Sequence, residues 1–157
     1  MLGAGSAADN QILARYVKNY TDQFSMELGG RPLVRSVAHL FHRIGYFNKN
    51  GILSSLIVCG WDDIHGQQIY AVPTGGAIIP RSKFYVSGSG GGIITGYLDA
   101  HWKPNMSYQE AQDLLLRAIG LSVKHDAASG GGIRFTNICK EEMKENFCGY
   151  NEIPRYE

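Results

Sequence analysis

The chain has 157 residues and a formal net charge of +1, from 15 Lys and Arg against 14 Asp and Glu. This length supports one domain with a real core, so we expect a single domain over residues 1–157. The balanced charge favours no nucleic-acid partner. No stretch of about 18 consecutive apolar residues occurs, so no membrane partner is expected either.

Two amphipathic helices are expected in the first half of the chain. In residues 6–28, apolar side chains recur at three- and four-residue spacing, which places them on one helical face. Ser6 or Asp9 can cap the start of this helix, and Gly29-Gly30 ends it. A second helix of the same kind ends at the turn signal Asn48-Lys49-Asn50-Gly51.

The segment before the first helix is strand-like. Residues 1–5 resemble the end of a strand that continues directly into the helix, and no earlier strand is present to pair with it. We therefore expect that the domain lacks its opening strands.

Short strands follow the second helix. Residues 52–61, residues 67–73 and a third segment around residues 84–87 alternate in the manner of strands, with polar turns between them. The pattern predicts an antiparallel meander.

The last third of the chain returns to helices. A glycine run at residues 88–92 leads into one helix, and the S-x-x-E capping box of Ser107 and Glu110 begins another. A glycine-rich loop then precedes a last strand over residues 133–138, which is followed by a polar tail. Because helices and strands are segregated along the chain, the fold class is expected to be α+β and layered.

Two features with cofactor or metal potential have simpler explanations. Gly91 and Gly96 have the spacing of a phosphate-binding loop, but Tyr97-Leu98 stands where Lys and Ser or Thr are required. His39 and His42 are three residues apart without a neighbouring carboxylate or thiol. We therefore expect no metal and no cofactor.

The cysteines do not indicate a nucleophile. Cys59, Cys139 and Cys148 are an odd number without a C-x-x-C pair, which fits a reducing compartment. His125 beside Asp126 has the form of an oriented base, yet no cysteine has a recognisable catalytic setting. Buried or idle thiols are the simpler expectation.

Asp126 and Ser129 form a more informative pair. They lie three residues apart in a glycine-rich loop, and Ser89 adds a hydroxyl from the other glycine run. Taken alone, such a pair is more often an Asx-type turn than a catalytic pair.

Several short segments resemble proteasome β subunits, in the same order and with similar spacing. The match covers nearly the whole chain. The segments are Gly5-Ser6-Ala7-Ala8-Asp9, Gly60-Trp61-Asp62, Pro73-Thr74-Gly75-Gly76, Ser87-Gly88-Ser89-Gly90, Gly96-Tyr97-Leu98-Asp99 and Asp126 through Ser129-Gly130-Gly131.

Within this family, the chain is most similar to the caspase-like catalytic β subunit. That likeness rests on Asn105-Met106-Ser107, on residues 129–134 and on Ile153-Pro154. The trypsin-like sibling is the nearest rival, since Gly3-Ala4-Gly5 and His101-Trp102-Lys103 are similar to its sequence.

The resemblance implies a fold and a chemistry. The fold is a four-layer αββα sandwich of the N-terminal-nucleophile hydrolase type, here without its first strands. The implied chemistry is that of a threonine protease, in which an N-terminal threonine attacks the peptide carbonyl and its own α-amino group acts as the base. Neither this nucleophile nor the Asp and Lys that tune it are in the chain, whose threonines are Thr21, Thr74, Thr95 and Thr136.

The resemblance also implies roles for residues that are present. Ser89, Asp126 and Ser129 match the family residues that hydrogen-bond near the threonine amine and its water. Gly5 matches the glycine whose backbone N–H serves the oxyanion hole.

Three further residues correspond to the substrate-binding region. Gly3 and Ala7 match positions that line the specificity pocket, and Gln11 lies nearby. The caspase-like subunit has an arginine where this chain has Gly3, so a preference for cleavage after Asp or Glu is in doubt.

The resemblance implies a β subunit of the 20S core that acts in ATP-dependent degradation of polypeptides. The implied partners are other α and β subunits in stacked seven-membered rings, in the cytoplasm and nucleus. One alternative is a noncatalytic structural subunit of the β ring, and another is a stand-alone nucleotide-binding α/β domain.

Overall fold

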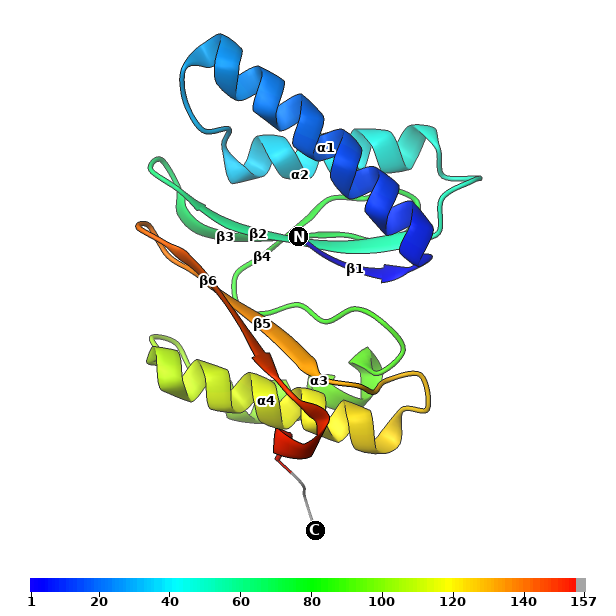
Figure 1. The fold of residues 1–157 in the computed structure, drawn as a ribbon, viewed down its shortest axis with the longest axis vertical. Helices are drawn as coiled ribbons and strands as arrows, with labels where there is room; N and C mark the ends of the chain where they lie inside the picture. The colour runs from blue at the N-terminus through cyan, green and yellow to red at the C-terminus, as the bar shows by residue number, and fades with distance from the viewer. Residues whose placement is uncertain (155–157) are drawn as a thin grey trace. The chain divides into compact units, whose positions relative to one another are not determined.

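The computed structural model describes residues 1–154, apart from the side chain of Leu28, and the chain divides into two compact units (Figure 1). The first unit holds residues 1–87 and the hairpin tip Ile138–Glu142, and the second holds residues 88–137 and the segment from Met143 onward. The expectation of one domain over residues 1–157 stays a prediction.

The first unit contains a four-stranded antiparallel sheet in the order β1-β2-β3-β4. The strands are β1 (Leu2–Gly5), β2 (Ser54–Asp62), β3 (Gly66–Val72) and β4 (Ile79–Arg81). At the edge of the sheet, β1 pairs with β2, from Leu2 opposite Ile57 to Gly5 opposite Ser54. The strand-like start of the chain thus finds its partner later in the sequence.

The strand predicted around residues 84–87 is wrong. These residues are irregular, and Ser87 Oγ instead donates a hydrogen bond to Ser55 Oγ at 2.8 Å. The edge of β3 is taken by β4, whose residues Ile79 and Arg81 lie opposite Ala71 and Ile69. Because β4 precedes residues 84–87 and already pairs with β3, the strand propensity of residues 84–87 is not realised there.

Two helices cover one face of this sheet (Figure 1). Helix α1 (Ala7–Leu28) begins where Ser6 Oγ accepts a hydrogen bond from Asp9 N at 3.3 Å, so Ser6 is the cap. It ends at Gly29, which has the left-handed φ of 68°. Helix α2 (Val34–Phe47) follows.

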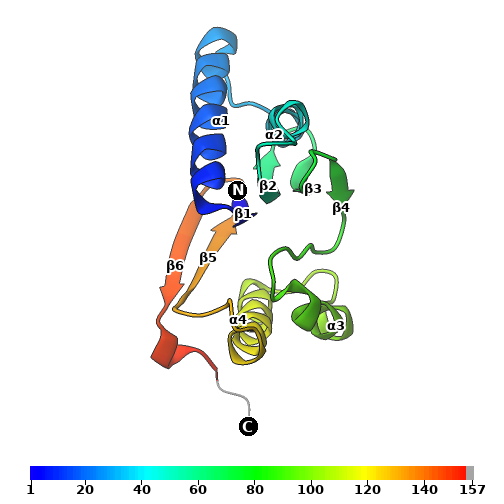
Figure 2. The same ribbon diagram turned by 90° about the vertical axis from the view of Figure 1, so that its right-hand side faces the viewer.

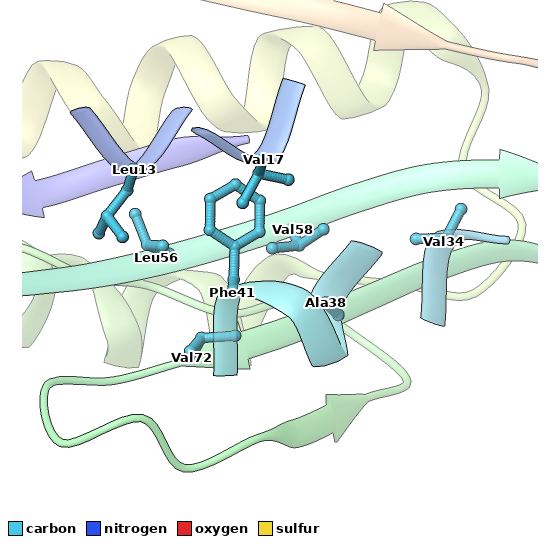
Figure 3. Close-up of a cluster of buried hydrophobic side chains, with 8 residues drawn as sticks. All are labelled: Leu13, Val17, Val34, Ala38, Phe41, Leu56, Val58 and Val72. Carbon is cyan, nitrogen blue, oxygen red and sulfur yellow. The ribbon is translucent and has the colours of Figure 1, made fainter. Parts of the chain in front are cut away.

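The core of the first unit lies between these helices and the sheet. Figure 3 shows the Phe41 ring of α2 among aliphatic side chains from α1 and from the strands. Phe41 is 3% exposed and Leu13 is 2% exposed. The other members are Val17, Val34, Ala38, Leu56, Val58 and Val72. Burial of these side chains fixes both helices on the sheet.

The buried carboxylate of Asp62, at the end of β2, ties the sheet to the start of α2. It accepts hydrogen bonds from Val34 N (3.1 Å), Ile64 N (3.1 Å), His65 N (2.7 Å) and Gln68 Nε2 (2.6 Å). Burial opposes ionisation, but these donors outweigh it and lower the pKa of Asp62 to about 2. The ionised Asp62 carboxylate, at the end of β2, thus caps the N-terminus of α2.

The second unit pairs two helices with a hairpin. Helices α3 (Gly91–His101) and α4 (Tyr108–His125) lie side by side (Figure 2). The capping box of Ser107 and Glu110 is present, as predicted. Strand β5 (Ile133–Ile138) pairs with β6 (Met143–Cys148), and a short helix, η1 (Tyr150–Glu152), follows.

The polar tail predicted after residue 138 is wrong, because β6 and η1 occupy it. In β6, only Asn146 and Cys148 are not exposed, so the apolar alternation that marks a strand is missing. Cys148 packs with Ile133 and Ile153 against α4.

The predicted α+β class is confirmed, since each unit combines helices with an antiparallel sheet. Within residues 1–154, no helix is long and apolar enough to cross a membrane.

We predict that Asp62→Asn lowers the free energy of unfolding by about 2–4 kcal/mol, because an amide offers one acceptor oxygen and places NH₂ against backbone donors. Urea unfolding followed by circular dichroism measures this loss. The matched control is Asp63→Asn. The Asp63 side chain is 81% exposed and 3.5 Å from Lys140 Nζ. This control should cost less than about 0.5 kcal/mol.

The stabilisation by Asp62 also has a definite pH dependence. Its folded-state pKa lies below the ordinary 3.8, so the contribution is present above about pH 4 and is lost as the pH falls toward 2. The difference between the wild type and Asp62→Asn should therefore shrink over that range. A difference that is constant with pH would contradict the ionised cap.

Candidate functional site

Four side chains of the second unit form what we call the carboxylate–hydroxyl cluster: Ser89, Ser122, Asp126 and Ser129. Ser122 is in the last turn of α4, and Asp126 ends that helix by donating its N–H to Ser122 O at 2.8 Å. Ser129 N then donates to Asp126 O at 3.0 Å, which turns the loop back. Ser89 approaches from the segment just before α3.

The Asp126 carboxylate is the centre of the cluster. Its Oδ2 accepts hydrogen bonds from Ser129 Oγ at 2.5 Å and from Ser89 Oγ at 2.6 Å, and its Oδ1 accepts one from Ala128 N at 3.3 Å. The Ser129 hydroxyl, followed by the Ser89 hydroxyl, holds the pKa of Asp126 below its ordinary value. Asp126 is therefore ionised near neutral pH, with the hydroxyls of Ser89 and Ser129 both bonded to its Oδ2.

The hydroxyl directions follow from this charge state. An ionised carboxylate only accepts, and each serine hydroxyl has a single proton to donate. Both protons point at Asp126 Oδ2, so the remaining lone pairs of Ser89 and Ser129 are acceptors. The cluster is thus suited to receive a hydrogen-bond donor such as an amine or a water molecule.

Sequence reasoning missed Ser122. Its side chain is buried, with 5% of the residue exposed, and its Oγ lies 3.1 Å from Ser129 Oγ. A single serine in an amphipathic helix carries no obvious signal. Its position four residues before Asp126, one helical turn away, is the only local pattern that points to it.

In the first unit, the junction of β1 and α1 carries the other predicted site residues. Gly5 has a left-handed φ of 106°, and a Cβ there would lie 2.5 Å from Leu53 O. The same Leu53 accepts a hydrogen bond from Ser6 N (2.8 Å), and its N–H donates to Asp9 Oδ2 (3.0 Å). Only glycine fits this crossing of backbone segments.

The space next to Gly3 is taken by Asn10, which sequence reasoning also missed. A Cβ on Gly3 would lie 2.8 Å from Asn10 Cγ, and Asn10 Oδ1 accepts a hydrogen bond from Ser54 Oγ at 2.6 Å. A side chain at position 3 would therefore have to displace the Asn10 amide. Ala7 and Gln11 are exposed near the start of α1.

The structure thus brings Ser89, Asp126 and Ser129 together in one unit, by hydrogen bonds between their side chains. The remaining predicted site residues, Gly3, Gly5, Ala7 and Gln11, lie in the other unit.

The metal and thiol candidates gain no support. His42 Nδ1 is hydrogen-bonded to Gly76 O, and residues 1–154 contain no group of three or more His, Cys, Asp or Glu able to hold a metal ion. Burial raises the pKa of the Cys59 thiol, which is opposite to what a nucleophile requires. The partners of Asp126 are serines and a backbone N–H, rather than His125.

The α+β class of the fold is of the kind that the resemblance implies, and comparison with known proteins shows the family. A family model described as "Proteasome subunit" matches residues 1–138. Proteasome subunit beta type-6 of Arabidopsis thaliana is 38% identical over 144 residues, which cover 92% of this chain and 61% of that protein. The chain therefore belongs to the proteasome subunit family, and within it to the β subunits.

Two further relatives are also named as proteasome β subunits. Proteasome subunit beta type-6 of Dictyostelium discoideum is 35% identical over 153 residues, covering 98% of this chain and 71% of that protein. Proteasome subunit beta type-9 of Oncorhynchus mykiss is also 35% identical over 153 residues, covering 98% of this chain and 70% of that protein. The chain thus spans roughly two thirds of the length of the curated relatives that it matches.

We predict that Ser89→Ala raises the pKa of Asp126 toward its ordinary value, because the carboxylate loses one of its two hydroxyl donors. Titration of the side-chain carboxyl by ¹³C NMR measures this shift. The matched control is Ser87→Ala, which removes a hydroxyl two residues away that is bonded to Ser55. An Asp126 pKa that is the same in both variants would refute the hydrogen bond from Ser89.

Proposed function

We propose that this chain is part of a catalytic β subunit of the 20S proteasome core, a threonine-type endopeptidase that cleaves polypeptides in ATP-dependent protein degradation. The nucleophile in this proposal is an N-terminal threonine that is not among these 157 residues. The carboxylate–hydroxyl cluster carries the proposal, because two serine acceptors beside an ionised aspartate suit a protonatable amine.

The proposed chemistry uses that amine as a base. The threonine hydroxyl loses its proton to the α-amino group as its oxygen attacks the peptide carbonyl carbon. The C–N bond then breaks, the proton moves to the leaving amine, and an ester forms that water hydrolyses. Ser89 and Ser129 orient the amine, and the negative charge of Asp126 stabilises it while it carries the extra proton.

Substrate roles are assigned to the β1–α1 junction. We assign the backbone N–H of Gly5 to the developing oxyanion, as in the family that the chain resembles. Gly3, Ala7 and Gln11 are assigned to the specificity pocket, and none of them is charged. Asn10 occupies the room beside Gly3, so an arginine-based preference for acidic substrate side chains is not expected.

The proposal includes assembly and location. The partners are other α and β subunits in stacked seven-membered rings, which makes the working protein a hetero-oligomer of cytoplasm and nucleus. The two compact units are proposed to be parts of one β-type domain.

The test is Asp126→Asn in assembled particles that contain the full-length subunit. We expect kcat for the peptides that this subunit cleaves to fall by about 100-fold, because the amine loses its charged partner. The matched control is Asp113→Asn in the same helix, where an exposed carboxylate accepts a hydrogen bond from Gln109 at 2.9 Å. Fluorogenic peptide hydrolysis and gel filtration of the particles provide the measurements.

Normal activity of the Asp113→Asn particles, beside loss of activity in intact Asp126→Asn particles, supports the catalytic role. Equal rates in wild-type and Asp126→Asn particles, for every peptide in a broad panel, would instead favour the noncatalytic structural subunit.

A further inference from the structure

We infer that Ser122 is a positioning residue of the proposed catalytic site, where its buried hydroxyl donates to Ser129 Oγ and fixes the Ser129 proton on Asp126. This inference rests on the proposed function. It adds a fourth side chain to Ser89, Asp126 and Ser129, and it gives a reason for the glycine at position 90.

The direction of the Ser122–Ser129 hydrogen bond follows from proton counting. Ser129 has one hydroxyl proton, and its 2.5 Å contact with the ionised Asp126 carboxylate uses it. Ser129 Oγ must therefore be the acceptor in the 3.1 Å contact with Ser122 Oγ, and Ser122 the donor. The result is a directed chain of hydroxyls that ends on the carboxylate.

Such a chain strengthens each of its members. A hydroxyl that accepts a hydrogen bond becomes a better donor, so Ser122 reinforces the bond from Ser129 to Asp126. The bond from Ser122 also restricts Ser129 to one rotamer, which leaves a single lone pair of Ser129 directed away from the cluster. The amine-binding geometry thus depends on a residue that never touches the amine.

Gly90 makes room for this arrangement. It is buried at the N-terminus of α3, and a Cβ there would overlap Ser122 Oγ and lie 3.1 Å from Ser129 Oγ. Its φ of −75° is open to any residue, so close approach and not backbone freedom requires the glycine. The helix start and the serine pair are therefore packed directly on each other.

The kinetic test compares Ser122→Ala with Ser122→Thr in assembled particles that contain the full-length subunit. Loss of the hydroxyl should lower kcat about 3- to 10-fold with an unchanged KM, as expected when one neutral hydrogen bond is lost. Ser122→Thr retains the hydroxyl and should restore kcat. The matched control is Ser25→Ala, which removes a hydroxyl bonded to Thr21 O in α1 and should leave kcat unchanged.

A second readout does not depend on activity. In the purified full-length subunit, the Asp126 pKa followed by ¹³C NMR should rise in Ser122→Ala and stay low in Ser122→Thr. Gly90→Ala keeps the Ser122 hydroxyl but displaces it, so it should reproduce the Ser122→Ala shift. It therefore tests the position of the hydroxyl, whereas Ser122→Thr tests its presence.

The two readouts separate the inference from the proposed function. Inactive wild-type particles would reject the proposed function, and the NMR titration would still show whether Ser122 supports Asp126. An unchanged Asp126 pKa in Ser122→Ala, or an unchanged kcat in active particles, overturns the inference. A rise in the pKa together with a loss of kcat that Ser122→Thr restores supports it.

Discussion

An ionised carboxylate can only accept hydrogen bonds, and at Asp126 this constraint sets the direction of the hydroxyls around it. Ser89 and Ser129 both donate their hydroxyl protons to Oδ2, which leaves the lone pairs of both hydroxyls as acceptors. Ser122 can then only donate to Ser129. The proposed binding of an amine follows from this polarity, because reversed hydroxyls would repel the same ligand.

The chain uses a second low-pKa aspartate in the opposite way. Asp62 is buried, and its four donors come from the protein itself, including the start of α2. The hydrogen bonds to that carboxylate therefore stabilise the fold. Asp126 lies at a more open position, and its hydroxyl partners have acceptor capacity to spare. The two aspartates therefore differ in the nature of their donors, although the pKa of each is lowered.

Local sequence signals predicted the elements that are formed by local interactions. The Ser6 cap, the capping box at Ser107 and the strand Ile133–Ile138 were found because spacing and caps act over a few residues. The strand around residues 84–87 and the polar tail were wrong, since β4 and β6 are formed by pairing with β3 and β5 rather than by a strand pattern of their own. Asn10 and Ser122 were missed for a related reason: glycines at positions 3 and 90 make room for them, and sequence spacing does not record such approaches.

The central claim is that the carboxylate–hydroxyl cluster serves the amine of an N-terminal threonine. The most direct measurement is the intact mass and first residue of this subunit, taken from purified native particles. The account predicts threonine as the first residue and a mass above the 17.3 kDa of these 157 residues. A mature subunit that begins with Met1 and has a mass of 17.3 kDa would contradict it, and the chain would then be a structural member of the ring.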